Sequence, residues 1–328
     1  MALNLKRMKN ILIFKTDRLG DLLNISPVLF NLKTNFPDSQ ITLVCSNYNK
    51  SIAKYYTNDL NIIIYNKPLI FFLFKNYLNL NKHNFDLILQ LDGKNHSYLT
   101  SVFLKANKKA CVKFIKNKKF LNKFFSVNRP NFLINKFFDI NEISYENYHL
   151  SDNHKYHYLS LYLNLLNNLN IKIISKDHYL PFNDPINPSN FNENYYLFHI
   201  DKRWERFDSV IKNKLKDKIL ILAKNYKIVL TSDIGGNKIF DYLKIELDNI
   251  ANVQFIENPD LHKTLSLIYY SNTCVSSHSG LIVHAAAAFK KNIIDLVSPS
   301  INNELDRWIP FNINYKRFDI NNFNNFDF

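Results

Sequence analysis

Short β-branched, apolar runs alternate with longer amphipathic stretches along most of the chain. This alternation is typical of parallel strands covered by helices, because a strand that is buried on both faces is apolar throughout. We therefore expect an α/β fold built from two open units in tandem. The expected strands are Asn10 to Phe14, Gln40 to Cys45, Asn61 to Tyr65, Asp86 to Leu91 and Ala110 to Phe114 in the first half, and Tyr195 to Ile200, Lys227 to Thr231, Val253 to Ile256, Thr273 to Ser276 and Asn292 to Val297 in the second.

The two series of strands predict two domains. A chain of 328 residues with 46% apolar composition can form two hydrophobic cores. A polar segment with three prolines, residues 178–194, predicts a linker, so we expect an N-terminal domain over residues 1–177 and a C-terminal domain over residues 195–328. A helix is expected over Asp21 to Asn35, with a kink at Pro27 because proline lacks the backbone donor of a helix interior.

The net charge of +14 is concentrated in the first half of the chain. Residues 1–150 hold 22 Lys and Arg against 9 Asp and Glu, and the remainder holds 20 against 19. From Gly93 to Phe138 there are 11 basic residues, several phenylalanines and no acidic residue. This stretch could contact an anionic membrane or a phosphorylated acceptor, or lysine could simply be the common surface residue of this sequence. Nucleic-acid binding is not favoured, because no motif of a nucleic-acid-binding domain accompanies the charge.

Cysteine spacing and hydropathy indicate a cytoplasmic protein without a disulfide framework. Cys45, Cys111 and Cys274 lie far apart and have no metal-ligand spacing, so we expect buried free thiols. No run of about 18 residues is apolar without charged or polar breaks, and Met1 to Asn10 lacks the apolar core of a signal peptide.

The first candidate site follows the first expected strand. This turn ends with the residues Arg18-Leu19-Gly20-Asp21. Gly20 permits a tight connection from strand to helix, and Asp21 begins the helix. A carboxylate there can cap the helix, because it favours the positive end of the helix dipole. It can also act as a general base on an acceptor hydroxyl. The sequence leaves both interpretations open.

Two further candidates lie in the second half. Lys202 and Arg203 follow the strand Tyr195 to Ile200 and could neutralise a diphosphate, or they could belong to a solvated basic loop. Ser279 and Gly280 begin a small-residue helix whose free amides can receive phosphate oxygens. His284 follows Gly280 on the same helix face, where it could bind a ligand or simply pack in the core.

Several common cofactor- and metal-binding motifs are missing from the sequence, which narrows the reactions that we expect. The chain has five glycines, none of them arranged as a dinucleotide-binding or P-loop fingerprint. No two aspartates are spaced D-x-D, so a metal-independent reaction without a bound cofactor is favoured.

Taken in order, these segments resemble glycosyltransferase family 9, the ADP-heptose:lipopolysaccharide heptosyltransferases. The opening strand with its G-D turn, P-x-L helix and L-K-x-x-F-P end is the most specific block. Lys202-Arg203-Trp204 resembles the K-R-W element of that family, and the segment from Ser277 to Ala288 resembles its D-S-G-x-x-H-x-A-A-A block. The resemblance extends over roughly residues 10 to 300, but residues 94–177 match no part of the family pattern.

The resemblance implies a GT-B architecture, with two Rossmann-like domains that face a central cleft, and transfer with inversion at the anomeric carbon. It implies an ADP-sugar donor and a lipid-linked or phosphorylated glycan acceptor, which would hold the protein at the inner face of the inner membrane. Carried over by position, Asp21 would be the base in a turn formed with Arg18 and Gly20. The donor would be bound by Lys202, Arg203, His278, Ser279, Gly280 and His284.

One position departs from the family pattern. His278 stands where the family has Asp before Ser-Gly. A histidine does not accept hydrogen bonds from sugar hydroxyls as a carboxylate does, and it can carry positive charge. This replacement favours, as an alternative, a transferase of the same fold that uses another nucleotide-sugar. A further alternative is a non-catalytic protein that binds nucleotide-sugars or phosphoglycans. The presence of Asp21 does not favour it, because such a protein has no need of a base.

Overall fold

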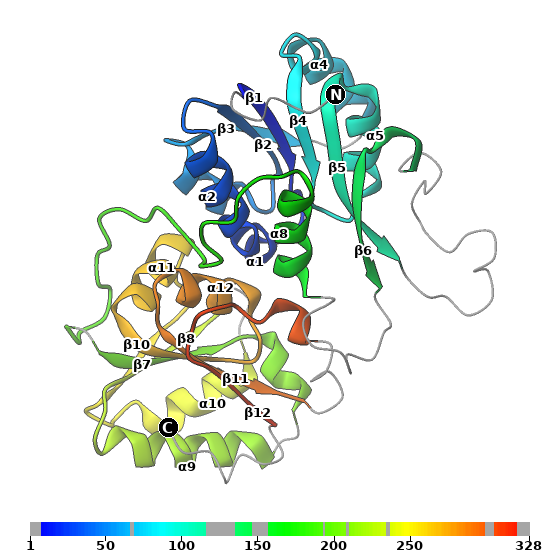
Figure 1. Cartoon of the computed structure of the whole chain (residues 1–328). Helices are drawn as coiled ribbons and strands as arrows, with labels where there is room; N and C mark the ends of the chain where they lie inside the picture. The colour runs from blue at the N-terminus through cyan, green and yellow to red at the C-terminus, as the bar shows by residue number, and fades with distance from the viewer. Residues whose placement is uncertain are drawn as a thin grey trace. The chain divides into compact units, whose positions relative to one another are not determined.

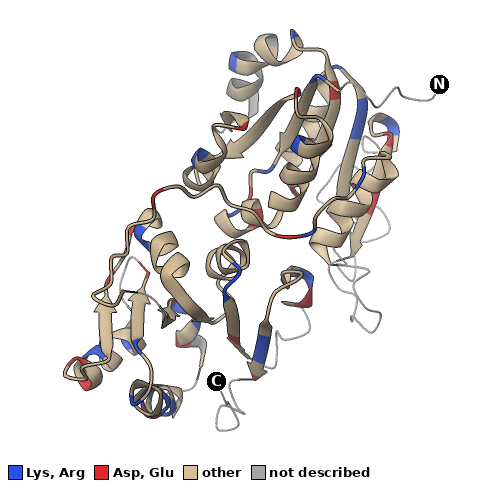
Figure 2. Cartoon of the chain, turned by 60° about the vertical axis from the view of Figure 1, so that its left-hand side comes forward, with Lys and Arg blue, Asp and Glu red and all other residues tan. Residues whose placement is uncertain are grey.

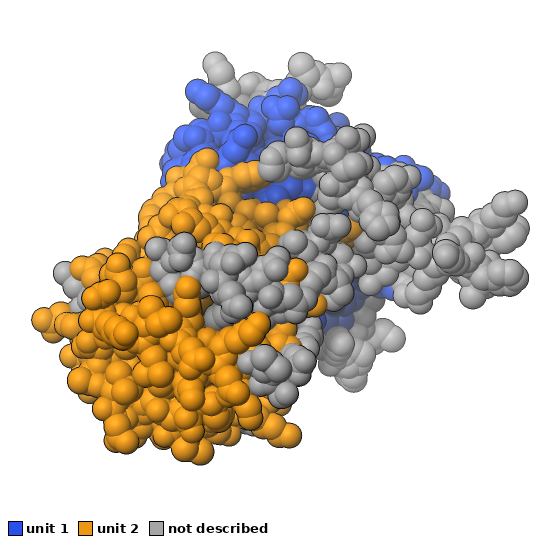
Figure 3. Space-filling view, turned by 90° about the horizontal axis from the view of Figure 1, so that it is seen from below, with its two compact units in different colours: residues 1–176 blue, residues 177–328 orange. Residues whose placement is uncertain are grey.

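The computed structural model describes residues 8–65, 69–115, 135–145, 157–192, 194–207, 210–233, 237–298 and 305–319. The chain divides into two compact units, residues 1–176 and residues 177–328 (Figure 3). Much of the basic, phenylalanine-containing stretch lies outside the described residues. The Lys and Arg residues of the described part are spread over both units and are interleaved with acidic residues (Figure 2).

The first unit is built on a six-stranded parallel sheet in the order β3-β2-β1-β4-β5-β6 (Figure 1). Four of the five residues of β1 are buried, as a strand covered on both faces requires. The elements are β1 Asn10–Phe14, α1 Leu19–Asn24, α2 Ser26–Asn35, β2 Gln40–Ser46, α3 Lys50–Ala53, β3 Leu60–Tyr65, α4 Leu69–Asn81, β4 Phe85–Gln90, α5 Asn95–Phe103, β5 Ala106–Ile115, β6 Ile140–Tyr145 and α8 Tyr158–Asn168, with a short 3₁₀ turn at Lys54–Tyr56.

The second unit repeats this architecture with a six-stranded parallel sheet in the order β12-β11-β10-β7-β8-β9. All six residues of β7 are buried. The elements are β7 Tyr195–Ile200, α9 Val210–Ala223, β8 Ile228–Ser232, α10 Lys238–Leu247, β9 Val253–Ile256, α11 Leu261–Tyr270, β10 Ser271–Ser276, α12 Gly280–Ala288, β11 Asn292–Val297 and β12 Tyr315–Asp319, with 3₁₀ turns at Lys202–Arg206 and Asp306–Trp308.

The α/β prediction and the ten expected strands are confirmed, with shifts of a few residues at some ends. Two strands were not predicted, β6 and β12, and both lie at an edge of their sheet. The helix expected over Asp21 to Asn35 is divided at Ile25. Pro27 therefore lies in the first turn of α2, where a missing backbone donor costs least, and the expected kink is a break between two helices.

Residues 178–194, predicted as a linker, are grouped with the second unit. Phe182 is buried there and packs against the rings of His262, Tyr269 and Phe289, with ring centroids 5.0 to 6.4 Å apart. The prediction of free cysteines is confirmed, since Cys45, Cys111 and Cys274 are all buried thiols.

Candidate active site

The turn between β1 and α1 holds the predicted base. Asp21 lies in the first turn of α1, and its Oδ2 accepts a hydrogen bond from the backbone N–H of Arg18 at 3.2 Å. Gly20 is buried in the same turn, whereas Arg18 is exposed. The local geometry of Asp21 therefore agrees with the capping interpretation. Oδ2 makes this hydrogen bond, and Oδ1 takes no part in it.

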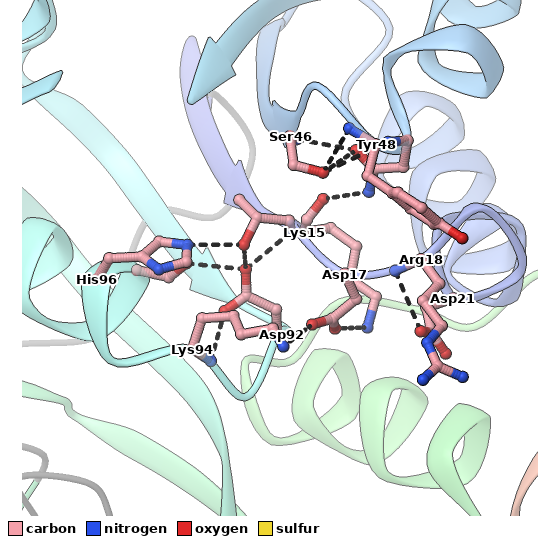
Figure 4. A network of polar contacts seen from close by, with 12 residues as sticks. Lys15, Asp17, Arg18, Asp21, Ser46, Tyr48, Asp92, Lys94 and His96 are labelled. Atoms are coloured by element: carbon pink, nitrogen blue, oxygen red, sulfur yellow. Dashed lines mark hydrogen bonds and ion pairs between the residues drawn. The ribbon is translucent and has the colours of Figure 1, made fainter. Parts of the chain in front are cut away.

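A buried ammonium group organises this turn. Lys15 is only 2% exposed, and its Nζ donates to Asp17 Oδ2 at 3.0 Å (Figure 4). The same Nζ donates to the Leu91 carbonyl at 3.1 Å and to the Tyr162 hydroxyl at 3.1 Å. Burial by itself lowers the pKa of Lys15, but Tyr162, Asp17 and Asp21 outweigh it and hold that pKa well above its usual value. The cluster therefore contains a permanent positive charge.

The electrostatics of Asp21 suit a base. Burial raises the pKa of Asp21, Lys15 lowers it, Asp17 adds a further rise, and the net pKa lies above the usual value of 3.8. A general base works best when its pKa approaches the working pH, so the shift is in the useful direction.

A second carboxylate, Asp92, was not predicted as a site residue. It is fully buried just after β4 and accepts hydrogen bonds from the Thr16 backbone N–H at 2.8 Å, the Thr16 hydroxyl at 2.7 Å and the Ser97 hydroxyl at 2.8 Å. Thr16 also contacts His96 Nε2 at 2.8 Å, and the His96 ring stacks on Tyr65. Figure 4 shows Asp92 and His96 side by side in this network. The available signal was a polar residue directly after an apolar strand, because neighbouring parallel strands end at the same edge.

In the second unit, the two predicted cations have different surroundings. Arg203 is held by Asp201, which is buried and accepts both the Arg203 backbone N–H at 2.9 Å and its guanidinium. The Lys202 side chain is exposed. Trp204 is fully buried and donates from Nε1 to the His199 carbonyl at 2.9 Å. Lys202 is therefore the more exposed of the two cations, whereas the guanidinium of Arg203, whose side chain is 36% exposed, pairs with Asp201.

His199, Asp201 and Asp233 each bring one potential ligand atom to a common point, within 4.8 Å of one another. These atoms already have partners. His199 contacts Asp233 Oδ1 at 3.2 Å through Nε2 and Thr231 at 3.1 Å through Nδ1. The hydrogen bond from His199 lowers the pKa of Asp233. A metal ion would have to displace these contacts beside the Arg203 guanidinium, so the arrangement fits an ion-pair network better than a cation site.

The turn before α12 holds His278, Ser279 and Gly280. Ser279 is the residue before the first turn of the helix, and Gly280 begins it. The backbone of His278 is left-handed, with φ of 51°. Its Nδ1 lies 2.5 Å from Oδ2 of Asp295, a fully buried carboxylate of β11 that the sequence analysis did not single out.

His284 is buried within α12, at 1% exposure. Its Nδ1 lies 3.0 Å from Nε2 of His178, and the two rings stack with an interplanar angle of 9°. His178 comes from the proline-containing segment 178–194. This contact fits the packing interpretation of His284, and its donor-binding role stays a prediction.

No protein-family model matches the sequence, and no curated protein does. Solved structures do match. The E. coli heptosyltransferase WaaC with ADP superposes with a TM-score of 0.67 at 16% identity, over 96% of this chain and 98% of that chain. A family 9 glycosyl transferase from Veillonella parvula gives a TM-score of 0.68 at 14% identity, over 95% and 86% of the two chains. The chain has the GT-B fold of family 9 glycosyltransferases.

The GT-B fold is shared with other nucleotide-sugar proteins. UDP-GlcNAc 2-epimerase from Methanocaldococcus jannaschii gives a TM-score of 0.56 at 14% identity, over 95% of this chain and 89% of that chain. The fold alone therefore does not fix the reaction. Within the GT-B architecture, Arg18, Gly20 and Asp21 belong to the first Rossmann-like unit, and the six predicted donor residues belong to the second.

Among the residues that the structure describes, none of the helices combines the length and apolarity that a membrane-spanning segment needs.

Proposed function

We propose that this protein is an inverting, metal-independent glycosyltransferase that moves a sugar, heptose from ADP-heptose in the first instance, to a lipopolysaccharide core or related surface glycan. The observation that carries the proposal is Asp21, a half-buried carboxylate with a raised pKa beside the buried Lys15 ammonium in a GT-B fold. A protein that only binds nucleotide-sugars has no need of a base at that position.

The proposed reaction is a single displacement. Asp21 takes the proton of an acceptor hydroxyl, whose oxygen attacks the anomeric carbon as the bond from that carbon to the diphosphate oxygen breaks. Lys202 balances the charge of the departing diphosphate, since its side chain is exposed and Arg203 is held by Asp201. Attack from the face opposite the leaving group inverts the anomeric carbon.

Nucleotide binding is the first test. The purified protein is screened by thermal shift against ADP, UDP, GDP and CDP and against ADP-heptose, because a ligand that binds only the native state raises its apparent stability. Selective stabilisation by ADP and ADP-heptose supports the donor. A preference for another nucleotide would keep the mechanism and replace ADP-heptose as the donor. His278 already favours this second candidate, a transferase of the same fold that uses another nucleotide-sugar. The absence of any response would point to a non-catalytic scaffold.

The base is tested by Asp21→Asn, with the exposed Asp38→Asn as the matched control. We expect Asp21→Asn to lower kcat by about 10²- to 10⁴-fold and to leave the Kd of the donor unchanged, because a general base acts in the transition state. Turnover equal to that of the control would rule out Asp21 as the base. Conversion of a UDP-sugar without acceptor would indicate epimerase chemistry instead.

We place the protein in the cytoplasm, peripherally at the inner face of the inner membrane, on the basis of its excess of basic residues. Liposome sedimentation should increase with anionic lipid and decrease with salt, since the attraction is electrostatic. Sedimentation that responds to neither would remove the membrane from the proposal.

A further inference from the structure

The buried ammonium group of Lys15 has as many acceptors around it as it has donors. An ammonium group carries three N–H donors and cannot accept. Lys15 Nζ lies 3.0 Å from Asp17 Oδ2, 3.1 Å from the Leu91 carbonyl oxygen and 3.1 Å from the Tyr162 hydroxyl oxygen. Each of its three N–H groups therefore has an acceptor of its own.

Asp21 lies close to this cation but is not ion-paired with it. Its Oδ2 accepts from the Arg18 backbone N–H at 3.2 Å, and within the described part of the chain no Lys or Arg side chain forms an ion pair with its carboxylate. Burial raises the pKa of Asp21, and Lys15 lowers it through space. A direct ion pair with Lys15 would lower that pKa further and so weaken the base.

Asp17 is the acceptor that carries the balancing charge. Its Oδ2 takes the Lys15 contact, and its Oδ1 lies 3.7 Å from Lys94 Nζ (Figure 4). Lys94 is positioned by its backbone N–H, which donates to the buried Asp92 at 3.0 Å. The Asp17 carboxylate therefore lies between two ammonium groups, one buried and one about half exposed.

We propose that Asp17 is a positioning residue that keeps the Lys15 ammonium engaged, so that Asp21 is left without an ion pair and can take a proton from the acceptor hydroxyl. This inference rests on the proposed function, in which Asp21 is the base. Asp17 also acts on Asp21 by the repulsion between two negative charges, which raises the pKa of Asp21. The two effects can be separated, because repulsion requires a charge at position 17, whereas engagement of Lys15 requires only an acceptor.

Two replacements of Asp17 make this separation. Asp17→Asn removes the charge and keeps an oxygen that can accept from Lys15. Asp17→Ala removes both, which frees one N–H of Lys15 to turn towards Asp21. We expect the pKa of Asp21 to fall in both variants and to fall further in Asp17→Ala. Tyr162→Phe removes an acceptor of the same ammonium without removing a charge, so it should also lower the pKa of Asp21, and it takes the place of Asp17→Ala if that variant does not fold.

The titration has to be assigned to Asp21 itself, because several charged and titratable groups surround it. In the described chain they are Lys15 at the end of β1, Asp17 and Arg18 in the turn, Lys50 on the neighbouring α3, Lys94 before α5 and Tyr162 on α8. In ¹³C NMR of protein labelled at the aspartate carboxyl carbons, the signal missing from Asp21→Asn identifies Asp21. This measurement needs neither donor nor acceptor.

The second readout is the pH profile of transfer from ADP-heptose to a lipopolysaccharide core acceptor. A weaker base should lower kcat at neutral pH by about tenfold in Asp17→Ala and by less in Asp17→Asn, and should move the low-pH side of the kcat/KM profile to lower pH. A loss of stability alone would lower the rate without moving the profile. The exposed Asp38→Asn, as the matched control, should change neither the rate nor the profile.

Equal pKa values of Asp21 in Asp17→Asn and Asp17→Ala would overturn the inference, because the charge of Asp17 would then account for the whole effect. An Asp21 pKa in Asp17→Ala equal to that of the unaltered protein would overturn it as well. A protein that shows the expected pKa changes but transfers no heptose would contradict the proposed function instead, and the action of Asp17 on Lys15 and Asp21 would still be supported.

Discussion

Lys15 Nζ donates a hydrogen bond to the Tyr162 hydroxyl at 3.1 Å, although the two residues are 147 positions apart in the sequence. Tyr162 is buried on α8, and Lys15 follows β1, so this contact fastens the helix to the turn that carries Asp21. The same ammonium holds Asp17 at 3.0 Å. A single buried cation therefore joins the last helix of the first unit to the candidate base.

Replacing Lys15 by Met should destabilise the first unit by about 3 kcal/mol, because three acceptors lose their donor and the partly buried Asp17 loses its counter-charge. Urea denaturation followed by hydrogen exchange of the β1 and β4 amides would report this unit alone. The exposed Lys54→Met serves as the control. Equal exchange in the two variants would contradict a structural role for Lys15.

The charge of Asp21 should cost stability at neutral pH. Burial raises its folded pKa above the usual 3.8, so the folded state binds the proton more tightly than the unfolded chain. Stability from this group is fully present below 3.8 and is lost as pH rises through the folded pKa. Asp21→Asn keeps an acceptor for Arg18 and should melt at the same or a higher temperature than wild type at pH 7, with the difference shrinking by pH 4. A lower melting temperature at pH 7 would show that the carboxylate stabilises the fold.

We expect Lys202 to bind the diphosphate and Arg203 to stabilise the fold. Lys202→Ala should weaken ADP binding, more strongly at low salt, and change the free energy of unfolding by less than about 0.5 kcal/mol. Arg203→Ala leaves the buried Asp201 carboxylate without its cation and should cost about 2 kcal/mol of stability. Thermal unfolding and calorimetry on both variants check this division. The reverse assignment would make Arg203 the diphosphate ligand.

The three thiols should be unreactive in the native protein at pH 8. Burial raises the pKa of Cys45 to about 11 and that of Cys274 to about 12, and it raises the pKa of Cys111 further still. The reactive thiolate is therefore scarce and shielded. A thiol-disulfide exchange reagent should label none of the three before denaturation and all three after it. Rapid labelling of any native cysteine would show that its strand opens readily.

The central strands could be predicted from sequence because nearly every residue in them is buried. The strands Asn10–Phe14, Tyr195–Ile200 and Asn292–Val297 have the predicted bounds, because a central parallel strand must be apolar on both faces. The strands β6 and β12, with the sequences INEISY and YKRFD, escaped prediction. An edge strand is covered less completely, so polar residues can interrupt its apolar signal, as they do in β6 and β12. The edge strands β3 and β9, with the sequences LNIIIY and VQFI, are more apolar and were predicted.

The candidate site shows the same division. Asp21, Lys202 and the Ser279-Gly280 turn follow strand ends and could be found from sequence, since ligands of open parallel sheets bind at that edge. The residues that contact these positions and set their chemistry could not be found from sequence. Lys15 meets Tyr162, Thr16 meets Asp92 and His278 meets Asp295 across 147, 76 and 17 residues respectively.

The sequence by itself therefore determined the fold class, the buried thiols and the strand ends where chemistry can occur, because these follow from local apolar pattern and chain direction. Only the tertiary structure decided which carboxylates are buried, which cation is engaged and which carboxylate His278 contacts. These properties depend on desolvation and on hydrogen-bond donors from other strands and helices, and neither is encoded in the spacing of residues along the chain.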